Sequence, residues 1–175
     1  MASSRRFLRM IRHRAARVAI GASATRGQGS AGVVARGRDF MARLKLARFG
    51  TRDQGTFRRE LDRRTRALQR ALPRGTGSWG LARKLLCIFL RDCLYTTYLR
   101  NAYSLGPAEP FLEIPLDSIT ARRIREEVPE IPRWPGVKHS DPHLNAAYQA
   151  AAALVAKRQG VRRVHLDAFW WGQRP

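Results

Sequence analysis

The segment from Leu81 to Tyr103 constrains the fold more than any other part of the sequence. It is apolar over a broad surface, which predicts a helix with a broad buried face. Its apolar positions are Leu81, Leu85, Ile88, Phe89, Cys93 and Leu94. The apolar run is far too short to span a membrane. Such a helix needs other helices around it, and a chain of 175 residues has room for one domain rather than two.

The segment from Thr56 to Leu72 also repeats apolar residues at intervals of three and four, with arginines in most of the remaining positions. This pattern predicts an amphipathic helix that ends before Pro73. Glycines at 75, 77 and 80 predict a tight hairpin between this helix and the apolar one.

The rest of the chain also reads as helical, with one extended piece over 111–116 that contains a proline. Asp117 or Ser118 is expected to cap a short helix that runs to about residue 127. The Asp141-Pro142 pair predicts the start of another helix, which ends near Gly160. We therefore predict an all-α fold with short loops.

The charge of the chain is strongly positive and unevenly distributed. Lys and Arg number 34 against 13 Asp and Glu, a formal charge of +21. Residues 1–74 hold 20 basic and 4 acidic residues, so most of the excess lies there. Such a field favours polyanionic partners, with nucleic acid first and anionic membrane second. Because only four of the basic residues are lysines, part of the excess is attributable to an arginine-rich codon bias.

Residues 1–50 differ in composition from the remainder, so we divide the chain into an arm, 1–50, and a helical domain, 51–175. The arm is rich in Arg, Gly, Ser and Ala, and its only acidic residue is Asp39. Such a composition predicts disorder. Three interpretations remain open: a basic arm that touches phosphate, an organellar transit peptide, or a start upstream of a natural one near Met41.

The two cysteines, Cys87 and Cys93, lie six residues apart in the apolar helix and so do not share a face. A disulfide between them is not expected. Together with the absence of a secretory signal, this predicts reduced thiols and an intracellular protein, in the cytoplasm or nucleoid.

Several polar residues stand in apolar surroundings, where they are costly unless they are paired or functional. They are Lys84, Arg91, Asp92, Asp117, His165 and Asp167. Lys84 and Arg91 are two helical turns apart on one face. Asp117 lies at a helix start, where the helix dipole favours its ionised form. No spacing of histidines or cysteines indicates a metal site, and no cofactor is expected.

Three blocks of sequence, in this order, resemble the archaeal-type 8-oxoguanine DNA glycosylases, a branch of the helix-hairpin-helix glycosylase superfamily. The blocks are 81–91 (LARKLLCIFLR), 113–118 (EIPLDS) and 164–171 (VHLDAFWW). The resemblance covers residues 80–171, the C-terminal half. It implies a helix-hairpin-helix fold and base-excision repair of an oxidised purine in DNA, by a glycosylase with AP-lyase activity.

The resemblance also implies roles for individual residues. Lys84 would be the nucleophile that forms a Schiff base with the sugar, and Asp117 the carboxylate that supports departure of the base. Arg91, which stands where the family has a lysine, would line the base pocket with Asp167 and Trp171.

The expected partner is damaged duplex DNA, not a membrane. Gly77 and Gly80 of the hairpin and Arg83 beside it would contact phosphate, and Arg63 and Arg66 of the preceding helix would extend this surface. Two alternatives remain: a helix-hairpin-helix module that binds DNA or RNA without chemistry, and a helical scaffold for an acidic protein. The sequence does not indicate an oligomeric state.

Overall fold

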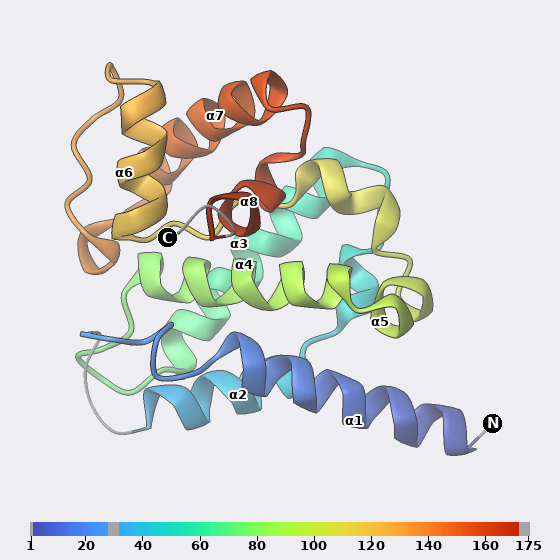
Figure 1. Cartoon of the computed structure of the whole chain (residues 1–175). Helices are drawn as coiled ribbons and strands as arrows, with labels where there is room; N and C mark the ends of the chain where they lie inside the picture. Colours follow the sequence, from blue (N-terminus) through green and yellow to red (C-terminus); the bar gives the residue numbers. More distant parts are fainter. Residues whose placement is uncertain (1, 28–31, 172–175) are drawn as a thin grey trace.

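The computed structural model describes residues 2–27 and 32–171, and every regular element within these ranges is helical, as predicted (Figure 1). The α-helices are α1 (Ala2–Ala19), α2 (Val33–Arg43), α3 (Gln54–Ala71), α4 (Trp79–Tyr95), α5 (Thr97–Ala102), α6 (Ser118–Glu127), α7 (Pro142–Arg158) and α8 (Leu166–Trp171). Short 3-10 helices are η1 (Leu46–Phe49), η2 (Gly106–Phe111), η3 (Val137–His139) and η4 (Arg163–His165).

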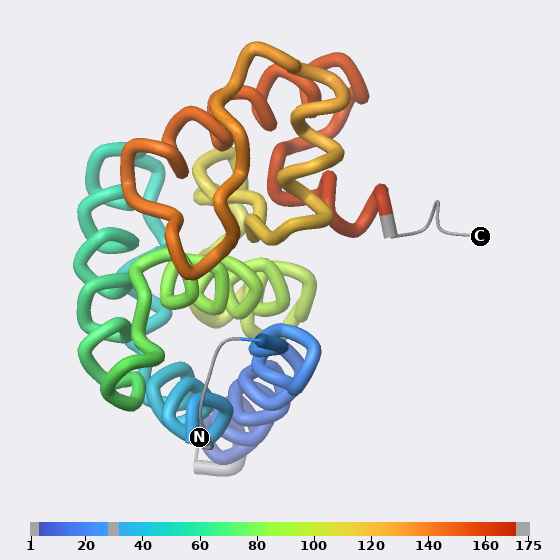
Figure 2. The backbone as a smooth tube through the Cα atoms, turned by 90° about the vertical axis from the view of Figure 1, so that its left-hand side faces the viewer, coloured from blue at the N-terminus to red at the C-terminus, as the bar shows by residue number. Residues whose placement is uncertain are grey.

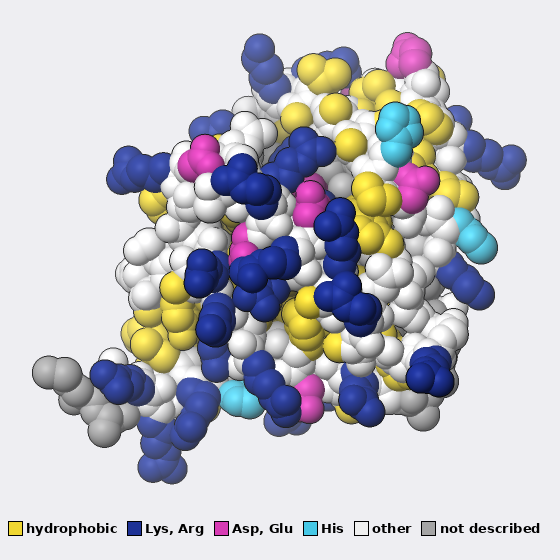
Figure 3. All heavy atoms as spheres, turned by 180° about the vertical axis from the view of Figure 1, so that it is seen from behind, with side chains coloured by type: hydrophobic (Ala, Val, Ile, Leu, Met, Phe, Trp, Pro, Cys, Tyr) yellow, Lys and Arg dark blue, Asp and Glu magenta, His cyan; other side chains and the backbone are white. Residues whose placement is uncertain are grey.

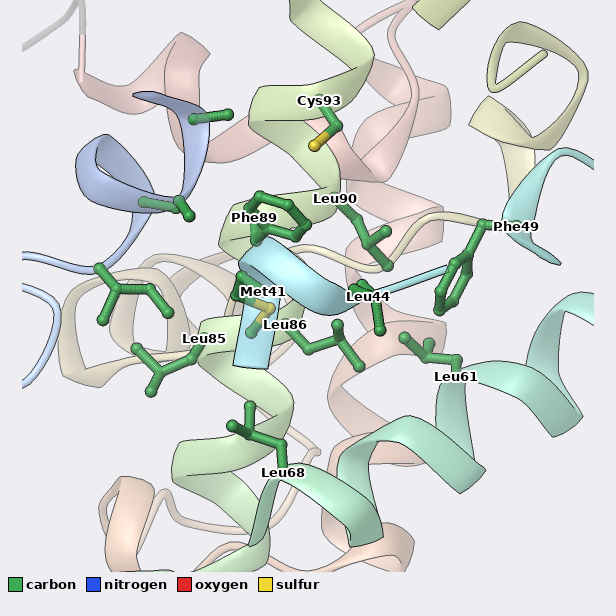
Figure 4. Packing of buried hydrophobic residues seen from close by; sticks show 14 of the residues in the cluster. Met41, Leu44, Phe49, Leu61, Leu68, Leu85, Leu86, Phe89, Leu90 and Cys93 are labelled. Carbon is green, nitrogen blue, oxygen red and sulfur yellow. The ribbon is translucent and has the colours of Figure 1, made fainter. Parts of the chain in front are cut away.

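Helix α4 is the central element of the described chain. Figure 2 shows it surrounded by α3 on one side, by α1 and α2 below, and by the C-terminal helices above. Leu81, Leu85, Leu86 and Phe89 are fully buried. They pack with residues of α1, α2 and α3 in the larger of two hydrophobic cores (Figure 4).

The N-terminal segment differs from the disordered arm that we expected. In the described residues, α1 and α2 pack against each other and against α4. Ile20 and Met41 are fully buried in the same core as the later helices, so this core crosses the division placed at residue 50. The composition hid a stripe of small and apolar residues, Ala15, Ala16 and Ala19, at helical spacing. Residues 28–31 of the arm lie outside the described residues.

The smaller core is built from the C-terminal part of the chain. It joins Ile114 and Leu116 to residues of α6, α7 and α8, with Tyr148 fully buried among them. The extended piece before α6 is held by the Gln149 side chain, which accepts from the backbone N–H of Ile114 (3.1 Å) and donates to its carbonyl (2.9 Å). This pairing satisfies a buried backbone unit that lacks a strand partner.

The predicted helix starts at Asp117 and Asp141 are confirmed. Asp141 accepts from the backbone N–H of Leu144 at 2.8 Å, with Pro142 in the first turn. Asp117 and Thr120 form a reciprocal capping box at the start of α6. The apolar helix, however, ends at Tyr95 rather than Tyr103. Its chain turns at Thr96, whose hydroxyl donates to the Asp92 carbonyl at 2.8 Å, and continues as α5.

Helices α3 and α4 pack against each other and are joined by the loop 72–78, which holds two of the predicted hairpin glycines. A Cβ atom at position 77 would lie 2.5 Å from the Gln69 carbonyl oxygen, so Gly77 allows the loop to close against α3. Gly75 has a φ of +80°, a conformation that favours glycine.

Candidate functional site

Lys84 lies in the second turn of α4 and is nearly buried, with a side chain 10% exposed. Its Nζ lies 3.6 Å from Oδ2 of Asp117. It also donates a hydrogen bond to the carbonyl oxygen of Ala24, at 3.2 Å. An ammonium or amine group has three sites for partners, so these two contacts leave one free. The predicted catalytic pair is therefore adjacent in space, although 33 residues separate its members in the sequence.

The two carboxylate oxygens of Asp117 make different contacts. Its Oδ1 accepts from the backbone N–H groups of Ile119 and Thr120, both at 3.0 Å, which caps α6. Its Oδ2 faces Lys84. The capping bonds fix the rotamer of the carboxylate, so the second oxygen is held in place beside the amine.

Arg91 and Asp167, both predicted pocket residues, form an ion pair between α4 and α8. Arg91 also lies 3.2 Å from Oδ1 of Asp92. Burial raises the pKa of Asp167 above its usual value, although Arg91 acts in the opposite direction, and the nearby Asp117 adds to the rise. Burial likewise raises the pKa of Asp92. Two carboxyl groups around one guanidinium therefore hold protons more readily than exposed carboxyls do.

The residues Lys84, Arg91, Asp117 and Asp167 line one open cavity of about 1410 Å³. Helix α4 contributes Lys84 and Arg91 to the lining, the start of α6 contributes Asp117, and α8 contributes Asp167. The size lies above that of ordinary small-ligand pockets, and the lining combines charged groups with aromatic and aliphatic side chains. Trp171, the fifth predicted site residue, falls in α8, but its side chain lies outside the described residues.

Part of the cavity lining comes from the N-terminal segment, which we did not predict as part of the site. Helix α1 contributes Arg14 and Val18, and the chain after it contributes Ala24 and Arg26. The signal available in the sequence was the spacing of Leu8, Ile11, Ala15 and Ala19, which predicts one apolar face on an otherwise basic helix.

The Tyr95 hydroxyl, which we did not predict as part of the site, also lies at the cavity. The Tyr95 hydroxyl is 2.9 Å from Nδ1 of His165, and Nε2 of His165 is 3.2 Å from Glu109. Tyr95 lines the cavity, and burial raises its pKa. The chain Glu109–His165–Tyr95 therefore fixes the orientation of a neutral hydroxyl at the rim.

Arg83 is placed differently from our expectation, because it is turned away from solvent. Only 5% exposed, it pairs with Asp62 at 2.5 Å and Glu113 at 3.1 Å, and it donates to the Thr65 hydroxyl at 2.9 Å. Its guanidinium is thus directed into the fold, whereas the predicted phosphate contact requires it to face solvent. Gly80 is also buried, and a Cβ there would lie 2.2 Å from the Val137 carbonyl oxygen. It serves close packing of η3 on α4.

Arg63 and Arg66 are exposed on α3, and no residue of α3 is among the described residues that line the cavity. Figure 3 views the molecule from behind, where many basic side chains lie with acidic ones among them. Arg63 and Arg64 both pair with Glu60. The structure thus separates these two predicted DNA contacts from the lysine site by the thickness of α4.

The described ranges contain neither a membrane-spanning helix nor a metal cluster. In these ranges no helix is both long and apolar enough to cross a membrane. Nor do three or more His, Cys, Asp or Glu side chains gather there in an arrangement that would hold a metal ion. Cys87 and Cys93 are free and buried, and burial raises the pKa of both thiols.

Comparison with known proteins gives no significant match: none to protein-family models, none to curated sequences and none to solved structures. Function is therefore inferred from the residues themselves and from the geometry of the cavity.

Proposed function

We propose that the protein is a DNA glycosylase with AP-lyase activity that removes an oxidised purine through a lysine Schiff base. The observation that carries this proposal is the contact between Lys84 Nζ and Asp117 Oδ2 at 3.6 Å in an open cavity. A nucleophilic amine beside a fixed carboxylate is the pair that base excision with sugar capture requires.

In the proposed reaction, the uncharged amine of Lys84 attacks C1′ of the sugar, and the bond from C1′ to the base breaks. The base leaves with the bonding electrons and takes up the proton that the Lys84 nitrogen loses as it bonds to C1′. The carboxylate of Asp117 stabilises the positive charge that develops on the sugar. The bond from C1′ to the ring oxygen then breaks, the ring oxygen takes up a proton from solvent, and a protonated Schiff base with Lys84 remains. Loss of a C2′ proton breaks the bond from C3′ to oxygen and releases the 3′ phosphate.

The cavity is consistent with an extruded nucleotide as substrate. A base can react with buried groups only after it leaves the stack, and it then needs a pocket that offers polar groups to its edge. Arg91 and Asp167 supply a donor and an acceptor on the side of the cavity formed by α4 and α8. Since the pKa of Asp167 is raised by burial, its carboxyl also takes up a proton more readily than an exposed one.

The test is borohydride trapping of the full chain on a duplex with one 8-oxoguanine, and on one with an abasic site. The full chain is needed because residues before position 50 form part of the core and of the cavity. We expect a covalent adduct that Lys84→Gln abolishes. Lys138→Gln is the matched control, since Lys138 is exposed and does not line the cavity.

Asp117→Asn tests the proposed electrostatic role of Asp117, because asparagine keeps the helix cap but removes the negative charge. We expect slower base removal by about 10²–10³-fold, the range for loss of one electrostatic group, with normal folding. An adduct retained by Lys84→Gln would refute the nucleophile. A folded protein that gives no adduct on either duplex would refute the enzyme.

The second candidate is a nucleic-acid-binding module without chemistry. The observation that favours it is the charge of α1, in which Arg5, Arg6, Arg9, Arg14 and Arg17 form no ion pair with any described carboxylate. Such a surface would bind a polyanion with steep salt dependence and no turnover. Binding of an acidic protein in place of DNA at moderate salt would instead favour the scaffold.

A further inference from the structure

A second, shallower groove adjoins the cavity on the far side of Trp134. Its volume is about 430 Å³, and it is lined by Arg122 and Arg125 of α6 and by Arg133 of the following loop. The groove and the cavity share Ser118 and Trp134 as lining residues. They therefore adjoin each other at these two residues, and we take Trp134 as the residue between them.

The dividing residue is held firmly. The Trp134 ring packs edge-on against Tyr148, with centroids 5.1 Å apart. It also packs against both hydrophobic cores, and the Tyr148 hydroxyl donates to the Pro132 carbonyl at 2.8 Å. A ring tied to its neighbours in this way keeps the groove and the cavity distinct and keeps their separation fixed.

The groove is cationic because its arginines outnumber its carboxylates. Glu126 is the carboxylate in the lining, and it pairs with Arg122 at 3.7 Å and with Arg123 outside the groove at 3.5 Å. Arg125 and Arg133 form no ion pair with a described carboxylate. Nε of Arg125 is buried and has no hydrogen-bond partner among the described residues. The donors left over are suited to the oxygens of a phosphate.

We propose that this groove, bounded by Arg122, Arg125, Arg133 and Trp134, binds the backbone phosphate next to the nucleotide held in the cavity. The inference rests on the proposed function, because it places a sugar beside Lys84. A nucleotide in the cavity must leave its two phosphates at the rim, and the groove begins at that rim with Ser118. The substrate is then a polynucleotide, and a free nucleoside would gain nothing from the groove.

The test compares a groove variant, Arg122→Gln with Arg133→Gln, with a charge-matched control, Arg158→Gln with Arg162→Gln. All four arginines are at least partly exposed, and neither control residue lines the groove. The probe is an oligonucleotide with one tetrahydrofuran abasic analogue, which binds without reacting. In a second series, one phosphate at a time on either side of the analogue is replaced by a neutral methylphosphonate.

For the groove variant we expect affinity to fall about tenfold for each arginine–phosphate bond removed, and the slope of log affinity against log salt to fall by roughly one. The control should match the wild-type protein. Methylphosphonate substitution at one position should weaken oligonucleotide binding by the wild-type protein and leave binding by the groove variant unchanged. Circular dichroism and unfolding midpoints verify that all variants are folded.

Equal affinity of the groove variant and the control would overturn the proposal. So would arginine-dependent binding of phosphatidylserine vesicles with unchanged oligonucleotide affinity, which would assign the groove to a membrane surface. Trapping on a natural abasic duplex is measured in parallel. Trapping without a groove effect refutes the groove alone, and a groove effect without trapping refutes the enzyme but supports the phosphate subsite.

Discussion

Arg83 and Lys84 are neighbours in α4, yet they meet opposite environments. Both are nearly buried, at 5% and 9% exposure. Arg83 is directed toward Asp62 and Thr65 of α3 and toward Glu113 of the extended piece, and the Trp79 ring lies 4.9 Å away. Lys84 faces a cavity, with one carboxylate and one carbonyl beside it. Burial and charge are alike in the two residues. They differ in the number of carboxylates that pair with the group, two against one, and in whether open space lies beyond it.

The same contrast extends to the arginines of two whole helices. On α3, Glu60 pairs with Arg63 and Arg64, and Asp62 pairs with the buried Arg83. Acidic residues of α3 therefore neutralise part of the charge on that side, although Arg58, Arg59, Arg66 and Arg70 form no ion pair with a described carboxylate. Helix α1 has no acidic residue of its own, and its Arg14 borders the cavity.

The largest expected effect is on stability, when Arg83 and Lys84 are replaced in turn. Arg83→Met leaves the nearly buried Glu113, whose side chain is 11% exposed, without its cation, which should cost about 3–5 kcal/mol of unfolding free energy. Asp62 is 35% exposed, so loss of that pair adds little. Lys84→Met should cost at most about 1 kcal/mol, because its partner Asp117 is a third exposed and solvent screens the pair. Urea unfolding of both variants measures the difference. Similar losses in the two variants would remove the distinction.

Removing charge from each side tests which arginines face a polyanion. Arg14→Gln with Arg26→Gln, both in the cavity lining, should weaken binding of an abasic-analogue duplex by about tenfold for each phosphate bond removed. Arg63→Gln with Arg66→Gln on α3 should change it less than about twofold, because only long-range attraction is reduced. Fluorescence anisotropy at several salt concentrations provides the comparison. A larger effect from the α3 pair would reverse our assignment of the binding face.

The smallest expected effect is a difference in carboxyl pKa between Glu60 on α3 and Asp167 in the cavity. For Glu60 on α3, burial acts to raise the pKa, but hydrogen bonds from Arg64 and Arg63 outweigh it and hold the pKa below 4.5. For Asp167 in the cavity, burial prevails over Arg91 and holds the pKa above 3.8. Carbon-detected NMR of the carboxyl groups should find Asp167 and Glu60 displaced in opposite directions from these values.

The sign of the stability effect follows from these directions. A lowered carboxyl pKa contributes stability above the unfolded value, and this is lost as pH falls through the folded value. Glu60→Gln should therefore destabilise the protein at neutral pH and cost less as the pH falls below about 4. A raised carboxyl pKa affects stability in the opposite direction, so ionisation of Asp167 opposes folding. We therefore do not expect Asp167→Asn to lose stability at neutral pH in the way that Glu60→Gln does. Unfolding midpoints measured across this pH range test both statements.

Helix boundaries could be predicted from the sequence where contacts between neighbouring residues determine them. Helix starts at Asp117 and Asp141 depend on side chains that bond to nearby backbone groups, so a short stretch of sequence suffices. The grouping of Lys84 with Asp117, and of Arg91 with Asp167, was an implication of the family resemblance that the three short sequence blocks carry. Their presence in a single cavity required the folded chain.

The remaining errors concern long-range packing. Arg83 could not be distinguished from Lys84, because its partners Asp62 and Glu113 lie 21 and 30 residues away. Gly80 was interpreted as a phosphate-binding residue, whereas the approach of Val137 makes it a packing residue. The N-terminal segment was expected to be disordered because its average composition is polar, although one narrow face of α1 provides a buried surface for α4.

The double use of Asp117 has a consequence for behaviour on heating. The oxygen that caps α6 and the oxygen that faces Lys84 belong to one carboxylate, so fraying of the first turn of α6 releases both. Helix ends open at temperatures well below global melting. The geometry beside Lys84 should therefore be disrupted before the fold is. Heat would disable this cavity while the hydrophobic cores remain intact, and cooling would restore it without refolding.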